Sequence, residues 1–230
     1  MTFTDQLRKD NDDIFQFILS HPFVEGIGKG EVPNKAIEHY IKADFEYLNA
    51  FMKIYGIALA KSTNRKEIAY FHKKIDFILN DEIHPHRNFC DYIGVNYEEL
   101  QGHPLPPTAD HYIKHMMYHA QMGNLGEILG ALLPCPWTYL EIGRELIQKY
   151  NPSNTHPFYP WITFYADKSV ENTTREMCEL LDKYMDHASP VEQLNVKDAF
   201  RKSCQLELQF WEMAYNYEQW PSKEKVTSNE

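Results

Sequence analysis

The sequence lacks the features that mark membrane proteins, nucleic-acid-binding proteins and secreted precursors. Its apolar runs fall short of the roughly 20 consecutive residues that span a bilayer. Lys and Arg form no cluster, and the formal net charge of −10 disfavours a polyanionic partner. Residues 1–10 carry neither the apolar segment nor the cleavage pattern of a signal peptide. We therefore expect a cytoplasmic protein with no membrane anchor and no nucleic-acid partner.

Cysteine is also scarce, and its spacing excludes a CxxC metal or redox motif. Only four occur, at Cys90, Cys135, Cys178 and Cys204. In a reducing compartment such cysteines remain free thiols. Most free cysteines are inert core residues, so each needs a further argument before it is assigned a function.

Strand-type alternation of apolar and polar residues is absent as well, and helical spacing takes its place. Pro and Gly gather at a few breaks, and apolar residues between them recur every three or four positions, as in Ile37, Ile41 and Leu48. We expect helices that begin near Pro33, Thr63 and Thr108 and helices over Leu125–Leu133, Pro136–Tyr150, Thr173–His187 and Val191–Tyr217. The sequence predicts an all-α, single-domain multi-helix bundle over residues 1–221, followed by a polar, frayed tail over residues 222–230.

Two carboxylates stand on helix faces that are otherwise apolar. Asp44 lies between Ile41 and Leu48, and Glu207 interrupts the apolar stripe of the last expected helix. A carboxylate on such a face is costly to bury unless it is paired or hydrogen-bonded. Each acid could simply bond a neighbouring Tyr or Arg and fix the helix register. Two of them in one bundle, beside the cysteine described next, favour a functional site.

Cys135 is flanked by Pro134 and Pro136. Pro136 suits the first position of a helix, which would place Cys135 at the N-cap. Backbone amides and the helix dipole at that point would lower the pKa of the thiol from its reference of about 8.5. Tyr139 lies one turn further along, within reach of whatever the sulfur attacks. The alternative is a small apolar plug at a helix junction, but the flanking prolines favour a nucleophile.

Four stretches of the sequence carry a resemblance to a known family. They are YIKADFEYLNAF (Tyr40–Phe51), ALLPCPWTYLEIGRE (Ala131–Glu145), WITFYA (Trp161–Ala166) and SCQLELQFWEMAY (Ser203–Tyr215). Taken in order over most of the chain, they resemble the TenA/thiaminase II family. The resemblance implies a heme-oxygenase-like fold, a homotetramer and an activity that needs no metal or organic cofactor. It also implies hydrolysis of thiamin or 4-amino-5-aminomethyl-2-methylpyrimidine to 4-amino-5-hydroxymethyl-2-methylpyrimidine.

The same resemblance assigns roles to individual residues. It implies that Cys135 is the nucleophile, Glu207 the acid beside the pyrimidine ring nitrogen, and Asp44 the carboxylate at the aminopyrimidine edge. The substrate-binding positions that it implies are Tyr47, Tyr112, Tyr139, Tyr165 and Phe210. In the implied reaction the thiolate adds to the ring, the amine or thiazole leaves, water adds to the exocyclic alkene, and the cysteine departs.

Two other classes of function remain open at this point. Glu82, His84 and His86, with His72 and Glu46 across the helices, could form a metal site. However, the paired Glu-x-x-His motifs of di-iron bundles are missing, and heme binding by fold analogy has still less support. A non-catalytic thiamin- or pyrimidine-binding protein, or a regulator, would need the pocket but no reactive thiol.

Overall fold

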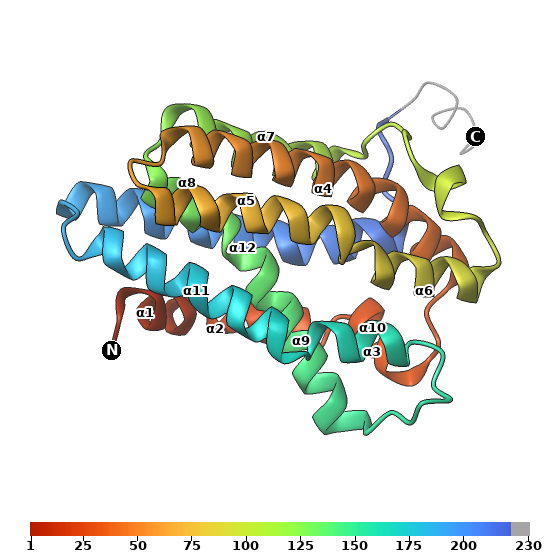
Figure 1. Ribbon diagram of the computed structural model, residues 1–230. Coiled ribbons are helices and arrows are strands. Elements are labelled where there is room, and N and C mark those ends of the chain that lie inside the picture. The colour runs from red at the N-terminus through yellow and green to blue at the C-terminus, as the bar shows by residue number, and fades with distance from the viewer. Residues whose placement is uncertain (222–230) are drawn as a thin grey trace.

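The computed structural model describes residues 1–221, and these residues form helices joined by short turns (Figure 1). The elements in chain order are α1 (Phe3–Asp10), α2 (Asp12–Leu19), α3 (Pro22–Lys29), α4 (Asn34–Lys61), α5 (Arg65–Asn80), α6 (Ile83–Ile93), the 3-10 helix η1 (Tyr97–Leu100), α7 (Pro107–Met122), α8 (Leu125–Leu132), α9 (Pro134–Tyr150), α10 (Tyr159–Tyr165), α11 (Lys168–Met185) and α12 (Pro190–Asn216). No strand occurs within this part of the chain, so the predicted all-α fold is confirmed. The frayed tail predicted for residues 222–230 lies outside the described residues.

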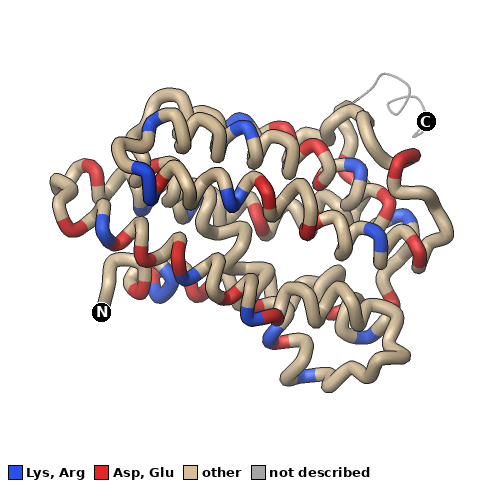
Figure 2. Tube along the Cα trace, in the orientation of Figure 1, with Lys and Arg blue, Asp and Glu red and all other residues tan. Residues whose placement is uncertain are grey.

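Helices α4 and α12 form the centre of the bundle. They contact each other, and α7 packs against both, while α5 lies along α4. The α8–α9 segment slants across these long helices in Figure 1. The core between them is aromatic: the rings of Tyr40 and Trp211 stack with centroids 5.4 Å apart. No helix within residues 1–221 is long and apolar enough to cross a membrane, and acidic and basic residues are interspersed along the helices (Figure 2).

Helix starts follow local capping chemistry. Ser189 forms a capping box with Glu192, and Pro190 occupies the first turn of α12, where no amide donor is needed. The predicted Thr63 cap of α5 is wrong by one residue, because the Asn64 side chain accepts from the first amides of that helix. Thr108 lies inside α7, whose first residue is Pro107.

The Pro-Cys-Pro segment joins two helices without turning the chain. Leu133 keeps helical dihedrals, with φ −59° and ψ −34°, and its amide still bonds to the carbonyl of Leu129. Pro134 is the first residue of α9, so Cys135 is the second residue of that helix. The predicted N-cap position of Cys135 is therefore wrong by two residues, because Pro134 takes the first position that was expected for Pro136.

Candidate active site

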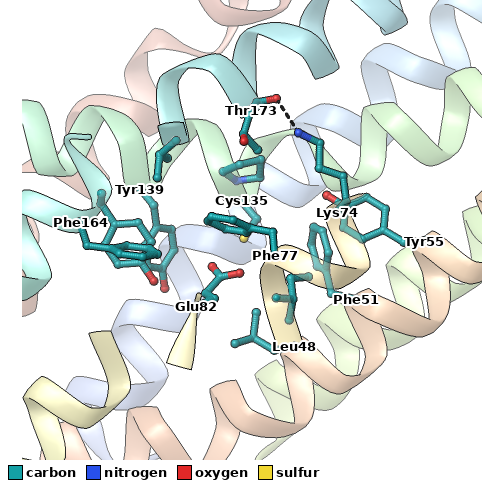
Figure 3. A pocket seen from close by; sticks show the side chains of 14 residues that line it. Leu48, Phe51, Tyr55, Lys74, Phe77, Glu82, Cys135, Tyr139, Phe164 and Thr173 are labelled. Carbon is teal, nitrogen blue, oxygen red and sulfur yellow. Dashed lines mark hydrogen bonds between the residues drawn. The ribbon is translucent and has the colours of Figure 1, made fainter. Parts of the chain in front are cut away.

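Cys135 lines a small cavity between α4, α5, α9, α10 and α11 (Figure 3). The residue is buried, with 9% of its surface exposed. The cavity measures about 40 Å³, which holds only a few water molecules, since one water needs roughly 10–15 Å³. Its apolar wall includes Leu48, Phe51 and Phe77. A ring-sized ligand would therefore have to displace side chains before it could bind beside the sulfur.

Glu207 reaches the same region from α12 and is held by two hydroxyl groups. Tyr112 Oη donates to Glu207 Oε1 at 2.6 Å, and Thr138 Oγ1 lies 3.4 Å from Glu207 Oε2. Thr138 also bonds to the backbone carbonyl of Cys135 at 3.1 Å, which ties the acid to the cysteine turn. Burial raises the pKa of Glu207 to about 7, although these hydrogen bonds oppose the rise. Such a carboxyl is available in both protonation states near neutral pH, as acid–base chemistry requires.

Asp44 is buried on α4 and bonds to a histidine. Its Oδ2 lies 2.7 Å from Nε2 of His86, and Nδ1 of His86 lies 3.1 Å from Oη of Tyr97. Sequence reasoning considered His86 only as a possible metal ligand, and its role as the partner of Asp44 was missed. Within residues 1–221, no group of three His, Cys, Asp or Glu side chains is placed to hold a metal ion. His86 lies four residues after Glu82, so the two side chains share one face at the start of α6. That spacing was the signal in the sequence that could have placed His86 at this site.

The predicted aromatic positions form two groups near Cys135. In the first, Tyr47 contacts Tyr112 and Phe210, with ring centroids 5.0 and 5.5 Å apart. In the second, Tyr139 and Tyr165 line the cavity with their ring centroids 4.8 Å apart.

The two groups differ in their relation to the cavity. Asp44 and Glu207, like the first aromatic group, do not line it. Tyr40, which sequence reasoning also missed, anchors the second group through a 2.7 Å hydrogen bond between the hydroxyls of Tyr40 and Tyr139. The buried hydroxyl of Tyr47 faces Cys135 and Glu207, and it opposes the rise in the pKa of both groups.

A glycine allows the close approach of α10 that places Tyr165 on the cavity. A Cβ at Gly143 would lie 2.6 Å from the backbone nitrogen of Ala166 and 2.8 Å from the carbonyl carbon of Tyr165. Both distances are shorter than side chains tolerate. Gly143 therefore permits the contact between α9 and α10 that brings Tyr165 against Tyr139.

The predicted lowering of the Cys135 pKa is wrong. Burial raises the pKa of the thiol well above its usual value, and the negative charges of Glu207, Glu82 and Asp44 raise it further. The sequence argument considered only the start of the helix. It did not account for enclosure by the bundle or for three nearby carboxyls, so the resting residue is a neutral thiol.

Glu82 is an acidic residue of this site that the sequence analysis did not assign to it. It immediately precedes α6, and it lines the cavity together with Cys135 and Tyr139. The side chain is partly accessible, yet desolvation raises the pKa of Glu82 to about 8, with a further contribution from Asp44. In the sequence, Glu82 was considered only as a possible metal ligand together with His84 and His86.

The chain is similar over most of its length to a known protein family and to proteins of named activity. The TENA/THI-4/PQQC family matches residues 8–217. An aminopyrimidine aminohydrolase of Staphylococcus saprophyticus subsp. saprophyticus is 32% identical over 222 residues, covering 96% of each protein. An aminopyrimidine aminohydrolase of Halalkalibacterium halodurans is 30% identical over 221 residues, covering 96% of this chain and 98% of its own.

Solved structures agree with the architecture. A TenA homologue from P. horikoshii OT3 superposes with a TM-score of 0.84 at 24% identity, over 94% of this chain and 99% of its own. A protein from Shewanella denitrificans OS217, described as having a heme oxygenase-like fold, gives a TM-score of 0.71 at 13% identity, over 93% of this chain and 92% of its own. These likenesses confirm the predicted heme-oxygenase-like fold.

Proposed function

The chain belongs to the TENA/THI-4/PQQC family, and on that premise we propose that it is an aminopyrimidine aminohydrolase with a cysteine nucleophile. The proposed substrates are 4-amino-5-aminomethyl-2-methylpyrimidine and thiamin, and the product is 4-amino-5-hydroxymethyl-2-methylpyrimidine. The observation that carries the proposal is the location of Cys135, which lines a cavity and is joined through Thr138 to the buried Glu207. The relatives named aminopyrimidine aminohydrolase support the same reaction.

The first step adds the thiol across a carbon–nitrogen bond of the pyrimidine ring. Glu207 donates a proton to the ring nitrogen, and the Cys135 sulfur bonds to the ring carbon next to the one that bears the methylene. The proton released by the thiol then restores Glu207, so that the step is balanced. A pKa near 7 suits Glu207 to both transfers, and ring protonation helps a neutral thiol to react.

The second stage replaces the amine by water. Electrons from the ring nitrogen expel the protonated amine, or the thiazole of thiamin, and leave an exocyclic alkene. Water adds to the methylene carbon, the carbon–sulfur bond breaks, and Cys135 recovers its proton. Asp44, oriented by His86, accepts hydrogen bonds from the 4-amino group and fixes the ring, while Tyr47 and Phe210 provide aromatic walls.

The test compares two cysteine substitutions. We expect Cys135→Ala to lose turnover of the aminomethyl-pyrimidine by at least roughly 10³-fold, as loss of a nucleophile does. Cys204→Ala is the matched control, because Cys204 is also a buried cysteine but does not line the cavity. Near-native turnover by folded Cys135→Ala would refute covalent catalysis. Mass spectrometry of quenched wild-type protein should detect a pyrimidine adduct on Cys135.

The assembly and cellular location remain predictions. We propose that the chain forms a homotetramer in the cytoplasm and that residues 1–221 constitute its single domain. Light scattering of the purified protein measures the first property, because a tetramer has four times the 27.2 kDa mass of one chain.

A further inference from the structure

The carboxyl of Glu82 is the acidic group on the cavity that the proposed mechanism leaves unused. Glu82 occupies the N-cap position of α6, but its side chain does not cap that helix. Within residues 1–221 the carboxylate has no hydrogen-bond or ion-pair partner. Figure 3 shows it pointing into the space that Cys135 faces. It is therefore held at the reaction centre without a partner of its own.

The remaining charge on the cavity wall does not compensate Glu82. Lys74 is the other charged residue that lines the cavity within the described chain. Its Nζ points toward α11, where it lies 3.3 Å from the carbonyl of Thr173 (Figure 3). The same atom lies 3.4 Å from Glu176 Oε2. An isolated carboxyl among aromatic and aliphatic walls is costly to ionise. A positive group on a ligand would remove that cost.

The position of Glu82 relative to Cys135 indicates which part of a ligand it meets. Glu207 binds the ring nitrogen in the proposed reaction, and it does not line the cavity. Cys135 lines the cavity and attacks the ring carbon next to the one that bears the methylene. The methylene and its leaving group therefore lie beside the sulfur, and the cavity that contains Glu82 is the space into which they extend.

We propose that Glu82 is the specificity-determining residue for the leaving group, and that its carboxylate binds the positive charge carried on the substrate methylene. This inference rests on the proposed function. Both proposed substrates carry such a charge, an ammonium in one and a quaternary thiazolium in the other, whereas the hydroxymethyl product is neutral. A charge-assisted contact in a water-poor cavity is strong. Glu82 thus favours substrate over product and helps the product to leave.

The experiment measures binding in a background that cannot react. Calorimetry on Cys135→Ala compares the aminomethyl- and hydroxymethyl-pyrimidines, which differ by an ammonium in place of a hydroxyl. We expect Glu82→Gln to weaken the aminomethyl ligand by at least about tenfold, or ~1.4 kcal/mol, and the hydroxymethyl ligand by less than about threefold. Glu82→Asp, which keeps the charge, should preserve part of the preference and serves if the Gln variant fails to fold.

A matched control separates local recognition from general loss of negative charge. Glu67 is a buried acid on α5 that does not line the cavity, so Glu67→Gln should leave both affinities unchanged. Equal weakening of both ligands by Glu82→Gln, or no weakening of the cationic one, would overturn the inference while turnover by the wild type still supported the proposed function. If the wild type has no turnover and Cys135→Ala binds neither ligand, the proposed function and the inference fall together.

Discussion

Glu207→Gln should abolish turnover and, at alkaline pH, make the protein more stable. Folding raises the pKa of Glu207 from 4.5 to about 7 by burial. A group whose pKa is raised on folding favours the folded state most below its unfolded pKa, and that advantage is lost as the pH rises through the folded value. Above about pH 7 the protein holds an ionised carboxylate where a neutral group would be more stable. The amide is neutral at every pH and can still accept from Tyr112.

The magnitude follows from the same pKa values. At ~1.4 kcal/mol per pKa unit, a rise from 4.5 to about 7 corresponds to roughly 3 kcal/mol of unfolding free energy at pH 8.5. At pH 5.5 the same calculation gives about 1.4 kcal/mol, because the folded carboxyl is then mostly protonated. The stability difference between Glu207→Gln and the wild type should therefore grow by roughly 2 kcal/mol between these two conditions.

Urea unfolding at about pH 5.5 and 8.5 measures that difference. Asp198→Asn provides the control, because Asp198 is an exposed acid on the same helix and is hydrated in both states. A Gln variant less stable than the wild type at the higher pH, or a difference that does not change with pH, would refute the desolvation argument. Turnover measured on the same samples should be lost at both pH values.

Two further predictions concern Tyr112 and Gly143. Tyr112→Phe removes the hydroxyl that holds the pKa of Glu207 down, so the alkaline limb of the pH–rate profile should move up by roughly one pH unit; an unmoved limb would exclude Glu207 as the acid. Gly143→Ala forces a Cβ within 2.6 Å of the Ala166 nitrogen and should destabilise the fold by about 1–3 kcal/mol, with a fall in thermal midpoint. An unchanged midpoint would show that α10 yields without strain.

The long helices were predictable because their signals are redundant. The last expected helix, Val191–Tyr217, matches α12 within a residue at each end, since Ser189 and Pro190 mark its start and its apolar spacing persists for many turns. The short helices α1–α3, α6 and α10 were not predicted. At 7 to 11 residues each, they contain too few turns for periodicity to stand out, and packing stabilises them.

The candidate site was predictable where a charged residue lies on an otherwise apolar helix face. Asp44 and Glu207 interrupt apolar stripes, and the structure buries both. The environment of Cys135 was not predictable, because its pKa depends on burial by the bundle and on carboxyls from three other segments. Glu82 does not interrupt an apolar stripe in the sequence. A glutamate beside a helix start is common, and only the fold shows that this one faces the cavity.

Enclosure of Cys135 has a consequence for how long the protein lasts in a cell. Cysteine is oxidised mainly as the thiolate, which attacks peroxides and disulfides, and oxidation of a nucleophile past the sulfenic stage is seldom repaired. Cys135 is held as a neutral thiol behind aromatic side chains, in a space that admits only a few waters. The same surroundings that oppose its ionisation therefore protect the sulfur from oxidation while no substrate is bound.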